Sequence, residues 1–501
     1  MEIRKIRFLE PGSPAYRPAF KNRFVYEETI RNPSIGLMTL ATIARGRVPD
    51  TRMYSESISL VDWKDVLDAD VVFLGVFTFA APRGYKLAQY IKAHSKAVVV
   101  MGGLHASMNY MEAVRYCDYV LLGEGDESIG EFLDALAAGR EPDFPGVAYR
   151  GRDGETVCTG ARRPPERFET VPDRGIVVGY RERAGYNTLW PQVHASRGCP
   201  HDCDYCAVVR HFGRRVRTRS PESVVEDIRQ AIAFHEPARG RRLTQMLWIT
   251  DDNFFADRAW AVSVLEAIID SGISYHFTIQ ARYEVGFDDE MLELMKRAGF
   301  TEVAMGIEFI EDESFEMYHK KCTKDDVVRS IRNIQAHGLG VRGLFILGAD
   351  SHTKGVGARL AAFVEAYGIK GVLIQAMYFV PGTPAYEAAK DRLLHRDWEK
   401  YCGNAVHRPA RMTAAELQRE VICASRKIYS PARLLRALLT RRGTDRVLFI
   451  GEYLWQASVR KRMRRELANL EAAELATQPA QIPPAQPAAT PAQPAATPMA
   501  G

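Results

Sequence analysis

The sequence predicts an α/β protein with an N-terminal doubly wound domain, a partial (β/α)6 barrel and a helical C-terminal region. Short, apolar, β-rich segments alternate with segments of helical spacing in two successive series. Glycines follow the strands of the first series, whereas polar side chains follow those of the second. Near residue 386 the strand signals stop, and helical segments rich in arginine take over.

These changes in pattern predict five regions in the 501 residues, which is enough chain for two or three domains. The last region is rich in Pro, Ala and Gln, so it cannot bury a core and should be disordered. The predicted regions are 1–140 (doubly wound domain), 141–190 (connector), 191–385 (partial barrel), 386–475 (helices) and 476–501 (tail).

The first series predicts an open parallel sheet. Strands are expected at 71–77, 97–103 and 119–125, because each is a short buried-type apolar run. A helix is expected at 83–94, and another at 127–139 with Gly139 as its stop. Ligands of such sheets bind beyond the carboxyl ends of the strands. The connector should begin with a hairpin that turns at Asp153-Gly154.

The second series contains six strand candidates with helices between them, which is typical of a (β/α) barrel. A helix is expected at 221–235, with Ser220 as its N-cap. Chemistry in such barrels takes place at the carboxyl ends of the strands. The expected strands are 192–196, 245–250, 274–280, 302–308, 343–348 and 371–380.

Composition narrows the class of protein. A net charge of +5 over 501 residues does not indicate nucleic-acid binding. No apolar run reaches the length of a membrane span, and the N-terminus lacks the apolar core of a signal peptide. Eight cysteines are too few for a disulfide scaffold. We therefore expect a cytoplasmic protein in which clustered cysteines bind a metal.

Three of the cysteines lie close together in "CPHDCDYC", as Cys199, Cys203 and Cys206. Ferredoxin-type clusters use four thiolates, so three would leave one iron without a protein ligand. An open position of this kind is what a catalytic metal centre requires. The alternative is a Cys3His zinc site completed by a nearby histidine, with His194, His201 and His211 as the candidates.

The C-x3-C-x2-C spacing, with Tyr205 before the last cysteine, resembles the signature of radical S-adenosylmethionine (SAM) enzymes. The resemblance implies that the three cysteines hold a [4Fe–4S] cluster and that SAM chelates the fourth iron. Reductive cleavage of SAM then gives a 5′-deoxyadenosyl radical, which abstracts hydrogen from the substrate. It also implies a set of SAM-contacting residues near the strand ends: Tyr205, Asp251, Asp252, Asn253, Gln280, Arg282 and Glu308.

The later strand ends agree with this family to different degrees. "YFVPGTPAY" (378–386) is close to the usual "PFPGTPLY". "GIEFI" (306–310) departs from "GIESG", and "ADSHT" (349–353) replaces "PGET". Tyr378 could line the substrate cavity or quench a radical, although a packed core aromatic is the more frequent explanation. The isolated Cys322, Cys402 and Cys423 are interpreted as ordinary thiols.

The N-terminal region resembles the cobalamin-binding class of radical SAM proteins, through "NPSIGLMTLATIA", "VVFLGVFTF", "GGLHAS" and "LLGEGDESIGEFLDAL". No D-x-H-x-x-G string occurs, so the resemblance implies cobalamin without a histidine ligand. His105 could instead be a helix-start histidine satisfied by backbone. The residues expected near cobalamin are Thr78, Gly102, Gly103, His105, Gly123, Glu124 and Gly125.

The resemblance implies a C-methyltransferase that acts on an unactivated carbon of a small-molecule or lipid-like substrate, with an electron donor such as flavodoxin or ferredoxin. One alternative is a radical SAM cyclase or oxidoreductase whose cobalamin domain is non-functional. Another is a non-catalytic Cys/His protein that binds metal or senses redox state.

Two basic segments have two interpretations each. The arginines of 210–222 could bind a phosphate or carboxylate substrate, or belong to a solvated loop that supports the cluster and the start of the next helix. The amphipathic segment 430–467 could contact an anionic membrane peripherally, or pack on the barrel.

Overall fold

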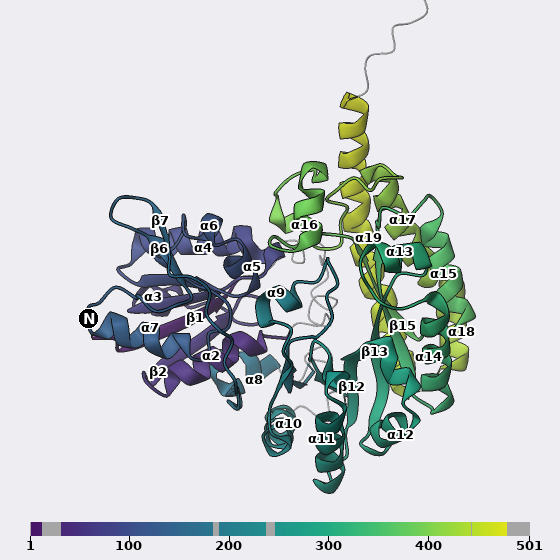
Figure 1. Cartoon of the computed structure of the whole chain (residues 1–501), viewed down its shortest axis with the longest axis horizontal. Helices are drawn as coiled ribbons and strands as arrows, with labels where there is room; N and C mark the ends of the chain where they lie inside the picture. The colour runs from purple at the N-terminus through teal and green to yellow at the C-terminus, as the bar shows by residue number, and fades with distance from the viewer. Residues whose placement is uncertain (1, 13–31, 184–189, 237–245, 442, 478–501) are drawn as a thin grey trace, which may run out of the picture.

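The computed structural model describes residues 2–12, 32–183, 190–236, 246–441 and 443–477, and it confirms the predicted α/β fold. Figure 1 shows the first sheet on the left, the second on the right and the C-terminal helices beyond the second sheet. The predicted tail lies outside the described residues, apart from its first two positions, which continue the last helix to Thr477.

The first sheet has the strand order β2-β1-β3-β4-β5-β6-β7, with β1 to β5 parallel. Because β1 pairs with both β2 and β3, the order reverses there, and ligands of such sheets bind at this reversal. The parallel strands are β1 (Lys5–Glu10), β2 (Asp50–Ser55), β3 (Val71–Gly75), β4 (Val98–Gly102) and β5 (Tyr119–Leu121).

Helices cover both faces of this sheet. The helices α2 (Ile35–Arg45) and α7 (Ser128–Ala137) bury Leu37 and Phe132 on one face. The helices α4 (Ala81–His94) and α5 (Leu104–Met108) cover the other face. Helix α3 (Trp63–Leu67) precedes β3, and α6 (Tyr110–Ala113) follows α5. The apolar spacing of the sequence thus produces the two-sided burial of a doubly wound sheet.

The predicted hairpin is confirmed, and it belongs to the first sheet. Strands β6 (Val147–Arg150) and β7 (Thr156–Cys158) pair antiparallel, and β6 also pairs antiparallel with β5. Gly154 supplies the positive φ of +84° that the turn requires. The first sheet therefore continues beyond residue 140, into the segment expected to be a connector. The rest of that segment carries η2 (Arg174–Ile176) and α8 (Tyr180–Arg183).

The second sheet has six parallel strands in the order β15-β14-β13-β12-β11-β8. Its two outermost strands, β8 and β15, do not pair with one another, so the described residues form the partial barrel that was predicted. The strands are β8 (Gln192–Val193), β11 (Met246–Ile249), β12 (His276–Ala281), β13 (Phe300–Glu308), β14 (Gly340–Leu347) and β15 (Gly371–Ala376).

The strand expected at 192–196 is shorter than predicted. The Ala195 backbone N–H donates to Asp251 Oδ1 at 2.7 Å instead of to a neighbouring strand. The chain therefore leaves the sheet after Val193 and forms β9 (Ser196–Arg197), which pairs antiparallel with β10 (Arg217–Thr218). This departure sends the following cysteines out over the edge of the sheet.

Helices follow the strands of the second sheet. Helix α10 (Pro221–His235) has Ser220 as its N-cap, whose hydroxyl accepts the N–H of Ser223, as predicted. Loops at the strand ends carry η4 (Phe254–Ala256), η5 (Tyr283–Phe287), α13 (Asp312–Met317), α16 (Pro384–Ala389) and η6 (Lys390–Arg392). The longer helices that follow are α11 (Arg258–Asp270), α12 (Asp289–Arg297), α14 (Lys324–Ala336) and α15 (Val356–Ala366).

The C-terminal region is helical, as predicted. Helix α17 (Ala414–Ile428) begins with a capping box between Thr413 and Glu416 and packs beside α15 and β15. Helices α18 (Pro431–Thr440) and α19 (Gly443–Thr477) follow. In the described part of the chain, no helix combines the length and apolarity that crossing a bilayer demands.

Candidate functional site

The cysteine loop, residues 198–207, connects β9 to α9 (Val208–Phe212). Gly198 has φ +92°, and a Cβ atom there would lie 2.5 Å from the carbonyl oxygen of Arg215, so the turn requires glycine. The Cys206 N–H donates to the Cys203 carbonyl at 3.0 Å, and the Cys199 N–H donates to the Gly213 carbonyl at 3.3 Å. All three thiols are half-buried. The backbone thus fixes three sulfur atoms on one short loop.

Polar side chains from two strand ends approach the sulfur atoms. Asn253 Nδ2 lies 3.9 Å from Cys199 Sγ, and Arg282 Nη1 lies 3.9 Å from Cys203 Sγ. Burial raises the pKa of Cys199, and it raises that of Cys206 to about 12. Nearby donors favour a thiolate over a thiol, and donors to sulfur also set the reduction potential of a cluster.

A single-ion site is not found among the side chains that the structure describes: no three of His, Cys, Asp or Glu are placed to hold one metal ion. The histidines considered for zinc have other surroundings. His194 is half-buried, and its ring lies 6.2 Å from that of Phe168 and 6.4 Å from that of Phe212. Thiolates that bind different irons of a cluster need not converge on one point, so three spaced thiols suit a cluster.

The Asp251-Asp252-Asn253 segment follows β11 and lies beside the cysteine loop. Asp251 is fully buried, and besides the Ala195 N–H it accepts the Ser196 hydroxyl at 2.6 Å. Asp252 accepts the Gly198 N–H at 3.4 Å. Burial raises the pKa of Asp251 to about 7 and that of Asp252 to about 6. Both carboxyl groups therefore support the start of the cysteine loop. A SAM contact by either stays a prediction.

Residues at the end of β12 also face this region. Arg282 is mostly buried and bonds to Glu284, with Nε 3.1 Å from Oε1. Gln280, the residue before the last one of β12, is half-buried. The charge of Arg282 lies beside Cys203, so it would offset the negative charge of bound thiolates.

Glu308 is the strained residue of the site. Its φ of +67° is rare for a residue other than glycine, and the pairing register of β13 shifts between Gly306 and Glu308. The buried Lys320 donates to the Gly306 carbonyl at 2.6 Å and lies 3.7 Å from Glu308 Oε1. A bulge of this kind re-aims a side chain, and strain of this kind collects at functional sites.

Tyr205 connects the cysteine loop to a second loop, residues 318–322, that sequence patterns did not identify. Its ring meets those of Phe309 and Tyr318 edge-on, at 6.0 and 6.1 Å. His319 Nδ1 lies 2.9 Å from Asp204 Oδ2. Because these partners are more than 100 positions away in the sequence, spacing could not have found them.

The loops after β3 and β4 contain two buried polar atoms for which the described residues offer no partner: Thr78 Oγ1 and His105 Nδ1. His105 is fully buried, its Nε2 lies 3.0 Å from the Tyr85 hydroxyl, and Trp398 packs edge-on at 5.2 Å. Burial lowers its pKa to about 4, so the ring is neutral. His105 therefore bonds to a side chain, and not to the helix-start backbone as the alternative interpretation had it.

The glycines of these loops differ in how much space a side chain at each position would have. Gly103 has φ +90°, and a Cβ there would lie 3.1 Å from the Val76 nitrogen. Gly123 has φ +73°, its N–H donates to the Ser107 hydroxyl at 3.0 Å, and its missing Cβ would meet no atom within 4 Å. Gly102 also leaves ordinary space, whereas a Cβ on Gly125 would lie 2.8 Å from Leu40. Open space for a bulky ligand is therefore at Gly123, and Gly125 serves packing.

The surroundings of the Glu124 side chain differ from the cobalamin contact that was expected. Its side chain is 2% exposed and forms ion pairs with Arg197, with Oε2 2.6 Å from Nη1, and with Arg217. The carboxylate is thus committed to the β9–β10 ladder beside the cysteine loop, which leaves only the backbone of Glu124 for the expected contact with cobalamin. Arg197 was not singled out from the sequence, and the burial of Arg217 was not expected, because nothing in their spacing marks a buried arginine.

The basic segment 210–222 combines exposed and buried arginines. Arg210, Arg214 and Arg215 are exposed, as a solvated loop predicts. Arg217 and Arg219 are buried and bind the protein carboxylates Glu124 and Asp227, so these two side chains support the loop from inside. Tyr378 is half-buried, with its ring 6.4 Å from that of Tyr401, and burial raises its pKa to about 12. All eight cysteines are free thiols.

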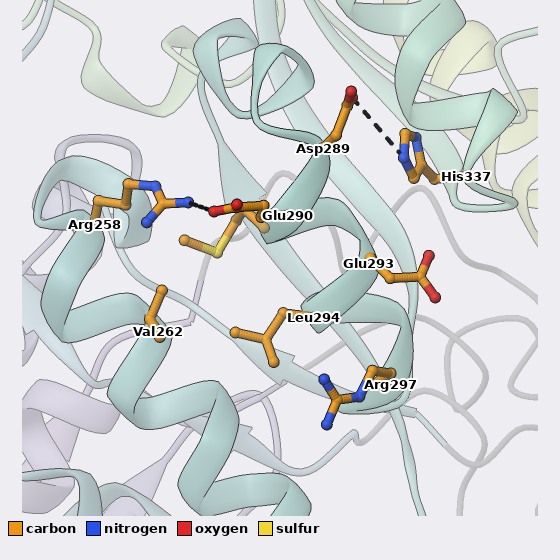
Figure 2. Close-up of a pocket in the computed structure, with 9 residues that line it drawn as sticks. Arg258, Val262, Asp289, Glu290, Glu293, Leu294, Arg297 and His337 are labelled. Carbon is orange, nitrogen blue, oxygen red and sulfur yellow. Dashed lines mark hydrogen bonds and ion pairs between the residues drawn. The ribbon is translucent and has the colours of Figure 1, made fainter.

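A separate hollow of about 580 Å³ lies on the outer side of the barrel, between α11 and α12 (Figure 2). Two pairs of its polar side chains face one another: Arg258 lies 2.9 Å from Glu290, and His337 lies 3.9 Å from Asp289. None of the predicted site residues lines it. The lining residues are Arg258, Val262, Asp289, Glu290, Met291, Glu293, Leu294, Arg297 and His337.

Residues 193–355 match the model of the radical SAM superfamily. The chain is 24% identical over 406 residues to the bacteriochlorophyllide d C-12(1)-methyltransferase of Chlorobaculum tepidum. The match covers 81% of this chain and 84% of the relative. It is also 24% identical over 405 residues to the anaerobic magnesium-protoporphyrin IX monomethyl ester cyclase of Rubrivivax gelatinosus, covering 77% and 70%.

Among solved structures, the chain resembles that of TsrM, a radical SAM methyltransferase from Kitasatospora setae, with cobalamin and a [4Fe–4S] cluster bound. The TM-score is 0.67 at 17% identity, and the match covers 93% of this chain and 100% of the other. This likeness extends over both sheets, so the two chains share their fold.

Proposed function

We propose that this chain, which belongs to the radical SAM superfamily, is a cobalamin-dependent C-methyltransferase acting on an unactivated carbon. The observation that carries the proposal is the contact between the two predicted cofactor loops. Arg197, two residues before Cys199, bonds to Glu124 in the glycine-containing loop after β5. A cluster site and a corrin site would therefore adjoin one another.

Cys199, Cys203 and Cys206 would hold three irons of the cluster. When bound, the cluster and SAM supply a radical that removes hydrogen from the substrate, and cobalamin supplies the methyl group. Asn253 and Arg282 would donate to the sulfur ligands, which orients them and tunes the cluster. Tyr205 would fix the last cysteine through its packing on Phe309 and Tyr318.

SAM would be oriented by Glu308, whose carboxylate is turned out of β13 by the bulge and can accept from ammonium or hydroxyl groups. Gln280 and Asp252 supply further polar groups at the same edge. Keeping these groups fixed before SAM binds is how a protein lowers the cost of orientation.

Cobalamin would lie over the carboxyl edge of the first sheet. The unpartnered Thr78 Oγ1 and His105 Nδ1, together with the open space at Gly123, fit a large ligand that carries polar side groups. His105 is buried under Trp398 and bonds to Tyr85, so we propose that it supports the loop and does not bind cobalt.

The relatives include a cyclase as well as a methyltransferase, so a radical SAM cyclase or oxidoreductase is the second candidate. Anaerobic reconstitution followed by gel filtration separates the two: retained corrinoid favours methylation, and its absence favours the alternative. Removing the gene product from its host should shift one metabolite by the mass of a methylene unit. A Cys203→Ala variant that still cleaves SAM would contradict the assignment of the cluster.

We propose a small-molecule or lipid-like substrate and an electron donor such as flavodoxin or ferredoxin. Thiolates that bind iron must stay reduced, which the cytosol favours, so we place the enzyme in the cytoplasm. Peripheral membrane contact is proposed for α18, where Leu435, Leu438 and Leu439 are exposed beside Arg433 and Arg436.

A further inference from the structure

Glu124 joins the two halves of the molecule through a buried ionic network. Its Oε2 lies 2.6 Å from Arg197 Nη1 and 3.0 Å from Arg217 Nη1, and its Oε1 accepts from Arg217 Nη2. Asp126 adds a contact of 2.8 Å to Arg197. Two carboxylates and two guanidinium groups thus balance in charge, and their side chains are at most 11% exposed.

The two arginines hold both ends of the cysteine loop. Arg197 lies in β9, immediately before the loop, and pairs across the ladder with Arg217 in β10. Arg217 Nη2 also donates to the carbonyl of Phe212, at the end of the helix that follows Cys206, at 2.8 Å. One carboxylate from the first sheet therefore restrains the chain before Cys199 and after Cys206.

The two residues that flank Glu124 in the chain also have close contacts with the first domain. Gly123 is tied to Ser107 through its N–H, and a Cβ on Gly125 would lie 2.8 Å from the end of the Leu40 side chain, which would then have to shift. The loop from Gly123 to Asp126, called here the corrin loop or glycine loop, is the one against which we propose that cobalamin binds. Displacement of this loop would therefore be passed to the cysteine loop through Glu124.

Stability alone is a poor reason for such a network. Replacing a buried ion pair with apolar residues of similar size is often neutral or stabilising, because desolvation of the charges is costly. What paired guanidinium and carboxylate groups add is a fixed relative orientation. We propose that Glu124 is a positioning residue that clamps the cysteine loop to the corrin loop and so couples SAM binding to cobalamin binding. This inference rests on the proposed function.

The test compares Glu124→Gln with Asp227→Asn in the reconstituted full chain. Asp227 is an apt control, because it is equally buried between two arginines, Arg174 and Arg219, each at 2.7 Å, but lies on α10 away from the glycine loop. Both variants should lose comparable thermal stability. Only Glu124→Gln should speed amide hydrogen exchange at 198–206.

The coupling itself is measured as the ratio of SAM dissociation constants without and with hydroxocobalamin. We expect a ratio of about fivefold or more for the wild type, a typical coupling between sites. It should fall to about one in Glu124→Gln and persist in Asp227→Asn. Equal ratios and equal exchange in the two variants, or no coupling in the wild type, would overturn the proposal.

A milder variant guards against misfolding. Glu124→Asp keeps the charge but is one methylene shorter, so it should reach one arginine and give an intermediate ratio. If the wild type retains no corrinoid on gel filtration, the proposed cobalamin function fails. The exchange measurement at 198–206 still decides whether the clamp exists, because it does not depend on that ligand.

Discussion

Glu308 shows how one residue departs from the conformation that its strand would impose. A left-handed backbone costs about 1–3 kcal/mol when the residue is not glycine. Here the bulge after Gly306 and the buried Lys320 hold it in place. The side chain thereby points along a direction that a regular strand would not allow, which suits a ligand contact.

We predict that Glu308→Gln lowers SAM affinity by about tenfold to a hundredfold, because a hydrogen bond to a charged group is lost. Equilibrium binding of SAM to the reconstituted protein measures this. Glu311→Gln is the matched control, because Glu311 lies only three positions after Glu308 but pairs with Arg359. Unchanged affinity in Glu308→Gln would remove Glu308 from the SAM site.

A second prediction concerns Asp251, whose pKa burial raises from 3.8 to about 7. Between these values the folded protein holds a proton that the unfolded chain releases, so this carboxyl makes stability fall as pH rises. Buried neutral histidines such as His105 act in the opposite direction, so the variant must be compared with the wild type at each pH.

Asp251→Asn should remove the destabilising effect that this carboxyl has as the pH rises. The free energy of unfolding of the variant, relative to that of the wild type, should therefore rise from pH 4 to pH 7. Urea unfolding of the cluster-free protein across this range measures the difference. A difference that does not change with pH would mean that Asp251 is ionised throughout, as its two hydrogen bonds would favour.

At the level of single elements, α18 has an unusual surface. Leu435, Leu438 and Leu439 are 60%, 41% and 76% exposed and share one face of the helix. The helix lies by the start of β15, next to Gly371 and Val372, and therefore at the end of the strands opposite the cysteine loop. Contact there would leave the catalytic edge free.

We predict that the full chain sediments with anionic vesicles more than with neutral ones, and less at high salt. Replacing Leu435, Leu438 and Leu439 with serine should abolish the binding, because the buried apolar area is lost. Leu60, which is 87% exposed outside this helix, is the control: Leu60→Ser should bind as the wild type does. Equal binding by the triple variant would show that α18 is not the contact.

In the whole molecule, the C-terminal region closes over the first sheet through Trp398. Its Nε1 donates to Glu112 Oε1 at 2.9 Å, and its ring covers His105. This contact joins residues almost 300 positions apart. It complements the Glu124 network, which holds the cysteine loop to the same sheet.

We predict that Trp398→Ala loses corrinoid on gel filtration and costs about 3–5 kcal/mol of stability, as expected for a buried aromatic. Trp398→Phe should lose only the hydrogen bond to Glu112 and retain most of the corrinoid. Trp260→Phe is the control, because Trp260 also donates its Nε1, to the Arg219 carbonyl at 2.7 Å, but lies in the barrel. Full retention by Trp398→Ala would contradict a closing role.

The sequence by itself determined the two α/β series, the helical C-terminus and the three clustered cysteines. These follow from local patterns: apolar periodicity, glycines at turns and thiol spacing. It also located Glu308, although not its bulge. The early end of β8 was missed, because the carboxylate that accepts the Ala195 N–H belongs to Asp251, 56 positions further along the chain.

Only the tertiary structure decided what the charged residues do. Glu124 was expected at cobalamin, and the arginines of 210–222 at a substrate or in solvent. Folding instead buries Glu124 with Arg197 and Arg217, which lie 73 and 93 positions away. A buried charge must find an opposite charge, and any of the many carboxylates and arginines could have served. Which pairs form depends on how the first sheet meets the β9–β10 ladder, and no local pattern records that.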